Sequence, residues 1–157
     1  RRRLCGYDVL DSVHQWNRIY GKKGFYQYQC VIPKKPDGAN NLRKLLQSIS
    51  DAKTGSFLAI LKLFGPRDEP YLAFASEGYT LALDFPNRTG TEALFKKLDD
   101  IVLQSGGRLY LTKDARMSRT MFEEGYPQLG LFKAEKKRID PENRYTSIQA
   151  ERLGLVH

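Results

Sequence analysis

The stretch Phe25–Pro33, FYQYQCVIP, constrains the fold more than any other part of the chain. It is dense in β-branched and aromatic residues and ends at a proline, which predicts a β-strand. Because side chains alternate across a strand, one face carries Tyr26, Tyr28, Cys30 and Ile32, and the other carries Phe25, Gln27, Gln29 and Val31. The first face is typical of a core. The two glutamines on the second face need hydrogen-bond partners from outside the strand.

The composition favours one basic domain. The 157 residues are enough for a single domain with a core. Lys and Arg number 26 against 18 Asp and Glu, so the net charge is +8 and nucleic acid, phosphorylated metabolites or an anionic membrane surface are candidate partners. A merely solvated basic surface is the alternative. Two Cys and two His predict neither a disulfide framework nor a metal site.

The sequence predicts neither a signal peptide nor a membrane span. No apolar run approaches the roughly 20 residues that a spanning helix needs. Arg1–Arg3 lead into Leu4 without the apolar stretch of a signal peptide, and the chain begins without Met. This abrupt start suggests a piece of a longer protein.

The remaining periodic stretches predict an α+β domain over residues 1–157. After a lead-in helix within 1–24, strands at 25–32, 56–64, 79–85 and 108–111 alternate with two helices. The first helix covers 39–50, and the second opens at Thr89, which forms a capping box with Glu92. The order β-α-β-β-α-β over 25–111 is that of a ferredoxin-like antiparallel sheet with helices on one face. A helical tail follows at 112–157, with helices near 117–126, 128–138 and 145–153.

The alternation of all four strands gives the predicted sheet two different faces. The helices should cover Tyr28, Cys30, Leu61 and Leu83. The opposite face mixes the polar residues Gln27, Gln29, Lys62, Thr80, Asp84, Arg108 and Tyr110 with Phe25, Val31, Ile60 and Phe64. Such a mixture is typical of a ligand-pocket wall completed by another domain. A hydrated sheet face without a ligand is the alternative.

No catalytic group can be assigned from the residues alone. The chain has no nucleophile–base pair, no Walker loop and no GxGxxG motif. Gly106-Gly107 reads as a helix stop rather than a phosphate loop. Lys62 and Lys113 are the candidate cations for an anionic group.

Several motifs carry a family resemblance in a shared order. They are WNRIYG at 16–21, QYQ at 27–29 with the following VIP, KLFGP at 62–66, LDFP at 83–86, GGRLYLTKDAR at 106–116, GYPQLGLFKAEKKRIDPENRY at 125–145 and RLGL at 152–155. Together they resemble the C-terminal part of FAD-linked oxidoreductases of the vanillyl-alcohol oxidase superfamily, and within it decaprenylphosphoryl-β-D-ribose oxidase and its relatives. The resemblance covers nearly the whole chain.

The resemblance implies a substrate-binding domain that lies over an FAD held mainly by a separate N-terminal domain, which this chain lacks. Tyr110 and Lys113 would approach the FAD. The substrate side would be lined by Gln27, Gln29, Lys62, Phe64, Thr80 and Ala82. Thr80 and Ala82 stand where the similar proteins carry Asn and Cys, which implies a smaller and less polar wall.

The implied chemistry is oxidation of a sugar or alcohol CH–OH group by hydride transfer to flavin. The partners would be the N-terminal FAD domain and a sugar or alcohol, with or without a phosphate or lipid group, and not nucleic acid. The isolated chain would be inactive. The implied location is the cytoplasm or the periphery of the inner membrane, and a periplasmic location stays open.

Two other functions fit parts of the pattern. An RNA-recognition module shares the order of elements and the basic charge, but its third-strand signature fails at three positions of 77–81, EGYTL. A small-molecule regulatory domain of the same fold would not need the helical tail.

Overall fold

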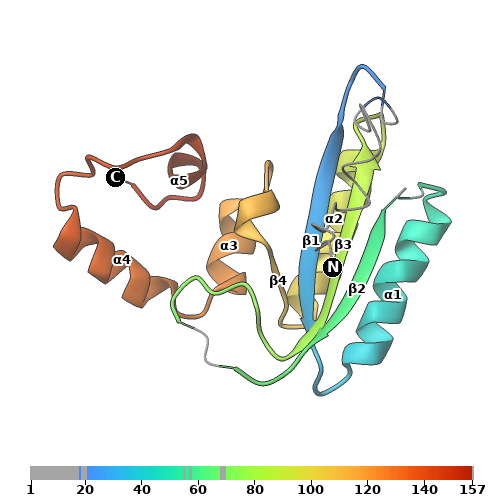
Figure 1. Ribbon diagram of the computed structural model, residues 1–157, viewed down its shortest axis with the longest axis horizontal. Helices are drawn as coiled ribbons and strands as arrows, with labels where there is room; N and C mark the ends of the chain where they lie inside the picture. The colour runs from blue at the N-terminus through green and yellow to red at the C-terminus, as the bar shows by residue number, and fades with distance from the viewer. Residues whose placement is uncertain (1–17, 19–20, 55, 57, 68–69, 157) are drawn as a thin grey trace, which may run out of the picture.

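The computed structural model describes residues 18, 21–54, 56, 58–67 and 70–156. Its centre is a four-stranded antiparallel sheet in the order β2-β3-β1-β4 (Figure 1). The strands are β1 (Phe25–Pro33), β2 (Ala59–Phe64), β3 (Gly78–Pro86) and β4 (Arg108–Leu109). The predicted α+β class with an antiparallel sheet is confirmed. The predicted lead-in helix within 1–24 falls almost entirely outside the described residues.

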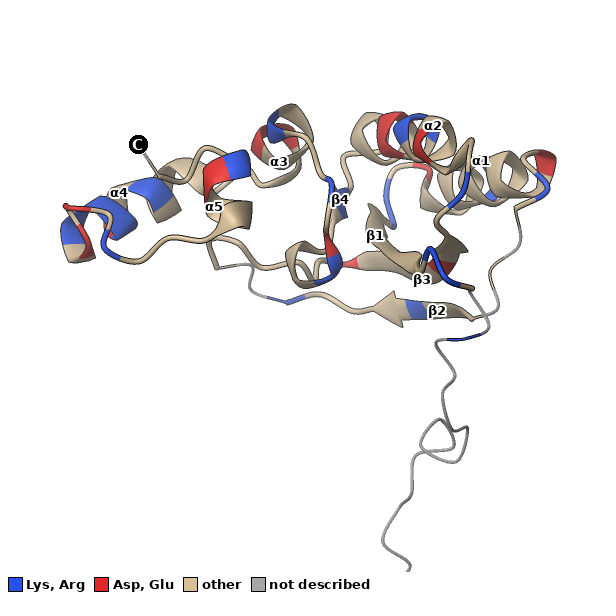
Figure 2. Cartoon of the chain, turned by 90° about the horizontal axis from the view of Figure 1, so that it is seen from above, with Lys and Arg blue, Asp and Glu red and all other residues tan. Residues whose placement is uncertain are grey.

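Two helices, α1 (Gly38–Asp51) and α2 (Thr91–Gln104), lie on the same side of the sheet (Figure 2). Along the chain, the elements follow the order β1-α1-β2-β3-α2-β4. The apolar stripes of the helices bury Leu45 and Leu98 against the inner side chains of β1 and β3. The core on this side also contains Tyr28, Cys30, Ile32, Leu81, Leu83, Phe85, Phe95 and Val102. Among the described residues, no helix covers the other face of the sheet (Figure 2).

The helical coverage differs from the prediction at the edge of the sheet. Tyr28, Cys30 and Leu83 are buried as expected, but Leu61 is 53% exposed. The pairing of Leu61 with Leu81 shows that its register was predicted correctly. Its exposure arises because α1 packs against β1 and β3, which leaves the inner face of the edge strand β2 uncovered.

The start of α2 also differs from the prediction. The residue before the helix is Gly90, with φ of 93°, and no side chain caps the helix. The Thr89–Glu92 capping box is therefore wrong. Glycine reaches this left-handed conformation without a steric penalty, so the chain turns sharply there after β3. The Thr91 hydroxyl donates instead to the carbonyl of Pro86 at 2.9 Å.

Two strands are shorter than predicted. β2 begins at Ala59 rather than at residue 56, because the Ser56 hydroxyl accepts a hydrogen bond from the Asp84 backbone N–H at 2.8 Å. β4 ends at Leu109, and Leu111–Lys113 form the short 3₁₀ helix η3. The N–H of Tyr110 still donates to the carbonyl of Gln29 at 2.9 Å, so Tyr110 remains beside β1.

The predicted helical tail forms α3 (Arg119–Gly125), α4 (Leu129–Ile139) and α5 (Ile148–Arg152), which lie beyond the β4 edge of the sheet (Figure 1). Tyr126 fixes the tail to this edge, because its buried hydroxyl donates to the Leu109 carbonyl at 2.6 Å. Within the part of the chain that the structure describes, no helix is long and apolar enough to cross a membrane.

Candidate functional site

The uncovered face of the sheet carries polar side chains from three strands, in two neighbouring rows of cross-strand pairs. Val31 pairs with Thr80, and Thr80 pairs with Lys62. The neighbouring row joins Gln29 to Ala82 and Ala82 to Ile60. Because paired residues share a face, Gln29, Thr80, Ala82 and Lys62 lie together on the side away from α1 and α2.

Thr80 provides the hydrogen-bond partner that Gln29 needs. The amide nitrogen of Gln29 donates to the Thr80 hydroxyl at 3.3 Å. That hydroxyl donates in turn to the carbonyl of Cys30 at 3.0 Å, and Thr80 is only 2% exposed. The chain of bonds fixes the Gln29 amide and leaves its carbonyl oxygen available as an acceptor. Gln27 and Lys62 are exposed on the same face, and Ala82 is half-buried.

Four of the predicted residues line one small cavity where β1 meets the segment after β4. These are Gln27, Gln29, Tyr110 and Lys113. The cavity measures about 10 Å³, and its wall also contains Tyr26, Tyr28, Phe95, Leu109, Asp114, Ala115 and Arg116. A space of this size holds about one water molecule, so the described residues form a wall rather than an enclosed site.

A second, open hollow of about 370 Å³ adjoins this wall. It is lined by Gln29, Phe64, Ala73, Phe74, Ala75 and Tyr110. The rings of Phe74 and Tyr110 lie 4.5 Å apart at 30°, and Phe64 meets Phe74 edge-on at 6.4 Å. The Arg67 guanidinium lies 5.1 Å from the Phe64 ring centre. Gln29 and Tyr110 border both spaces, whereas Lys62, Thr80 and Ala82 line neither.

Phe74 is a residue of this site that the sequence did not predict. It lies between β2 and β3 in a stretch that forms no strand and has no clear periodicity, so no sequence signal distinguished it. Its ring is nevertheless buried between Phe64 and Tyr110.

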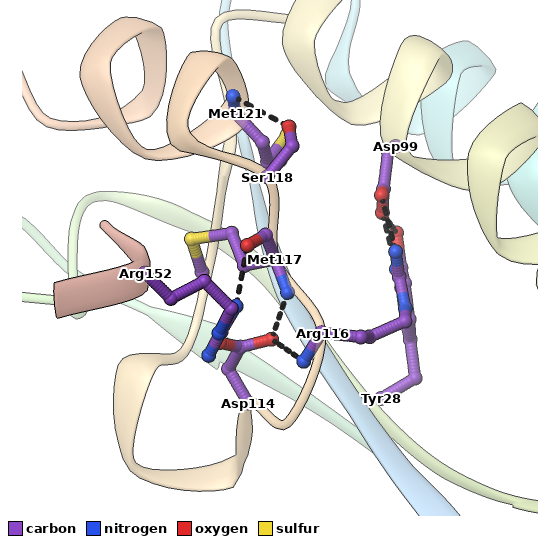
Figure 3. Close-up of polar contacts among 8 residues, drawn as sticks. All are labelled: Tyr28, Asp99, Asp114, Arg116, Met117, Ser118, Met121 and Arg152. Atoms are coloured by element: carbon purple, nitrogen blue, oxygen red, sulfur yellow. Dashed lines mark hydrogen bonds and ion pairs between the residues drawn. The ribbon is translucent and has the colours of Figure 1, made fainter. Parts of the chain in front are cut away.

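Ion pairs support the segment that carries Tyr110 and Lys113 (Figure 3). The Arg116 guanidinium binds both carboxylate oxygens of Asp99 on α2 at 2.8 Å, and the Tyr28 hydroxyl donates to the same carboxylate at 3.1 Å. Burial, together with the nearby thiol of Cys30, raises the Tyr28 pKa well above its ordinary value, so the hydroxyl keeps its proton. The sequence did not predict Asp99 or Arg116 as part of the site, because the two residues lie 17 positions apart in the chain.

The side chains present fit one edge of a flavin ring. A flavin ring edge carries carbonyl oxygens and ring nitrogens that accept hydrogen bonds. Lys113 offers an ammonium group and Tyr110 a hydroxyl, both on the wall of the small cavity. The glycine pair at 106–107 does not fit the pyrophosphate, because Gly106 ends α2 with φ of 69° and no helix starts there.

Comparison with known proteins decides the family. A family model described as D-arabinono-1,4-lactone oxidase matches residues 26–153. The chain belongs to this family. It is also 35% identical over 150 residues to decaprenylphosphoryl-beta-D-ribose oxidase of Mycolicibacterium smegmatis. This match covers 96% of this chain and 32% of that protein. An uncharacterized protein in the mprA 5′ region of Streptomyces coelicolor is 33% identical over 148 residues, or 94% of this chain and 39% of its own length.

These matches confirm the resemblance to FAD-linked oxidoreductases that the sequence motifs indicated. They do not favour the RNA-recognition module or the regulatory domain. The chain spans less than two fifths of the length of these curated relatives.

Proposed function

We propose that this chain is the substrate-binding domain of an FAD-dependent oxidoreductase that oxidises a CH–OH group of a sugar or sugar-derived substrate. The family name and the name of the M. smegmatis relative both denote oxidases of sugar-derived compounds, a lactone in one case and a lipid-linked ribose in the other. The FAD would be held mainly by an N-terminal domain of the same protein, outside this chain.

The observation that carries the proposal is the place of Gln29 and Tyr110. Both residues line the small cavity beside Lys113 and the larger aromatic hollow. A cofactor contact and a substrate wall would therefore lie side by side, which hydride transfer requires. When bound, the flavin would accept a hydride from the carbinol carbon of the substrate.

Each residue of this chain would then have a distinct part. Lys113 and Tyr110 would hold the acceptor edge of the flavin ring. The amide of Gln29, oriented by Thr80, and the exposed amide of Gln27 would bind substrate hydroxyls. Lys62 would bind an anionic group of the substrate, such as a phosphate.

The apolar residues would shape the pocket around the substrate. Phe64 and Phe74 would pack against the apolar face of the sugar or its carrier. Ala82 and Thr80 would leave room for the substrate between Gln29 and Lys62, since both side chains are small.

Anaerobic mixing of the full-length protein with candidate donors tests the proposal. Aldonolactones, aldoses, polyprenyl-phosphate sugars and simple primary alcohols are added in turn, and the absorbance of the oxidised flavin is followed. We expect a sugar-derived donor to bleach the flavin and a keto or lactone product to form. A protein that purifies without flavin, or one that no CH–OH donor bleaches, would contradict the proposal.

A further inference from the structure

The segment from Tyr110 to Met117 has little backbone structure of its own. It leaves the sheet at Leu109 and makes one short 3₁₀ turn, in which Lys113 N–H donates to the Tyr110 carbonyl at 3.1 Å. The backbone at Asp114 is extended again. A segment of this kind is held in one conformation only if side chains fix it to the neighbouring elements.

One fixed point is Arg116, three residues beyond Lys113. Its guanidinium makes two parallel bonds of 2.8 Å with Asp99 on α2, and the side chains are 25% and 13% exposed. The guanidinium also lies 4.5 Å from the Phe95 ring centre. A forked, planar contact of this kind fixes orientation as well as distance, which a single point charge does not.

The other fixed point is Asp114, the residue that follows Lys113 in the chain. Its carboxylate accepts from the backbone N–H groups of Arg116 and Met117, at 2.9 and 2.6 Å. It also binds the Arg152 guanidinium of α5 at 2.7 Å and is 4% exposed (Figure 3). The segment is therefore tied to α2 through Arg116 and to the tail through Asp114.

The Asp99–Arg116 pair does more than a core contact requires. Burying two charges removes them from water, and an apolar pair of similar size would stabilise the fold about as well. What the charged pair adds is a defined geometry. Arg116 lines the same small cavity as Lys113, Gln27 and Gln29, so this geometry is imposed at the proposed cofactor contact.

We propose that Asp99 and Arg116 are positioning residues that hold Lys113 at the flavin edge. This inference rests on the proposed function, in which Lys113 touches the cofactor. The pair acts only through the segment that carries Lys113. Tyr110, the other proposed flavin contact, is fixed separately by the bond from its N–H to the Gln29 carbonyl. The contribution of the pair to flavin affinity should therefore disappear when the Lys113 amine is removed.

A double-mutant cycle in the full-length protein tests the coupling. The apoprotein of wild type, Lys113→Ala, Arg116→Gln and the double variant is titrated with FAD, and the dissociation constant is measured from flavin fluorescence. We expect Lys113→Ala to raise the constant about tenfold, as for loss of one charge-assisted hydrogen bond, and Arg116→Gln to raise it several-fold. The double variant should bind FAD no more weakly than Lys113→Ala alone.

Two further variants separate positioning from folding. Arg138→Gln removes an exposed guanidinium from a surface pair with Glu135 and should leave the FAD constant unchanged. Asp99→Asn keeps the size of the side chain while weakening the ion pair with Arg116. It replaces Arg116→Gln in the double-mutant cycle if Arg116→Gln does not fold. Arg116→Gln should lower the thermal midpoint of unfolding by the same amount in the wild type and in the Lys113→Ala variant, because the fold loses the same contact in both.

The outcomes distinguish the two levels of the proposal. Multiplicative effects of the two substitutions on the FAD constant would overturn the positioning role, since Arg116 would then act independently of Lys113. The positioning role would also be overturned if Lys113→Ala weakened FAD binding while Arg116→Gln and Asp99→Asn both left the FAD dissociation constant unchanged. An unchanged constant in Lys113→Ala would overturn the flavin contact itself and the positioning role with it.

Discussion

At the residue scale, Lys62 is the side chain that we propose for binding an anionic group of the substrate. It is exposed on the uncovered face of β2, next to Thr80 in the cross-strand row. An ammonium group at this place can bind a phosphate or a substrate hydroxyl, and nothing in its position connects it with the small cavity beside Lys113.

Lys62→Met in the full-length protein should therefore weaken substrate binding and leave FAD bound. We expect the KM for an anionic donor to rise about tenfold, the effect of one lost charge-assisted contact, with an unchanged FAD dissociation constant. Steady-state kinetics and FAD titration measure the two quantities. Lys96→Met, an exposed lysine of α2, is the matched control. A parallel loss of FAD would assign Lys62 to the cofactor site instead.

Cys30 is a buried free thiol in the core of this fold. It is 0% exposed, and burial raises its pKa from 9.0 to about 12. The native thiol therefore keeps its proton at neutral pH. Since the unfolded chain ionises at lower pH, the neutral thiol contributes stability below pH 9 that is lost as the pH rises toward 12.

In a Cys5→Ser variant of this chain, Cys30 should react with a thiol reagent only after unfolding. At pH 8 the reaction should be at least about a hundredfold slower in buffer than in urea, because the thiolate is both rare and inaccessible. Absorbance of the released reagent gives the rate, and circular dichroism shows that the chain is folded. Fast reaction in buffer would mean that β1 opens readily.

At the scale of elements, the edge strand β2 is the least supported part of the sheet. Leu61 and Leu63 are 53% and 60% exposed on the side where α1 and α2 cover the other strands. Their partners on β3 are the buried Leu81 and the half-buried Tyr79, so in each cross-strand pair the residue on β3 is better covered than the residue on β2. Burial here depends on where α1 lies, not on the strand pattern.

The pair Leu61 and Leu81 gives a matched test in the isolated chain. Leu81→Ala should reduce the free energy of unfolding by about 2–5 kcal/mol, as for a truncated core leucine. Leu61→Ala should change it by less than about 1 kcal/mol, because most of the side chain already contacts water. Urea denaturation measures both values. Equal losses would show that β2 is covered in solution.

At the scale of the whole molecule, the described residues offer a wall for the cofactor and no cradle for its pyrophosphate. The cavity beside Lys113 measures about 10 Å³, and Gly106 ends a helix rather than starting one. A single charge-assisted contact contributes about 1.5–3 kcal/mol, whereas micromolar affinity needs about 8 kcal/mol. We therefore propose that the larger part of FAD binding comes from groups outside this chain.

The purified 157-residue chain should accordingly be colourless and should show no saturable FAD binding at micromolar concentration. Absorbance of the purified chain and fluorescence titration check this, with circular dichroism as the control for folding. A yellow chain carrying stoichiometric FAD would contradict the division between a wall in this chain and a cradle elsewhere.

Strand alternation alone determined which residues share the open face. The pattern of β1 and β3 placed Gln29 and Thr80 on the side opposite Cys30, and the observed register agrees. This was predictable because a strand has a period of two, so each residue's face follows from its neighbours. The family, too, was evident from the order of short motifs.

Tertiary structure alone decided how much each face is covered and what fixes the candidate site. The exposure of Leu61 depends on the position of α1, and the Arg116–Asp99 pair joins a loop to a helix that no local pattern connects with it. Phe74 reaches the hollow from an irregular stretch. Local periodicity describes neighbours along the chain, whereas packing and ion pairing depend on distances that exist only after the elements come together.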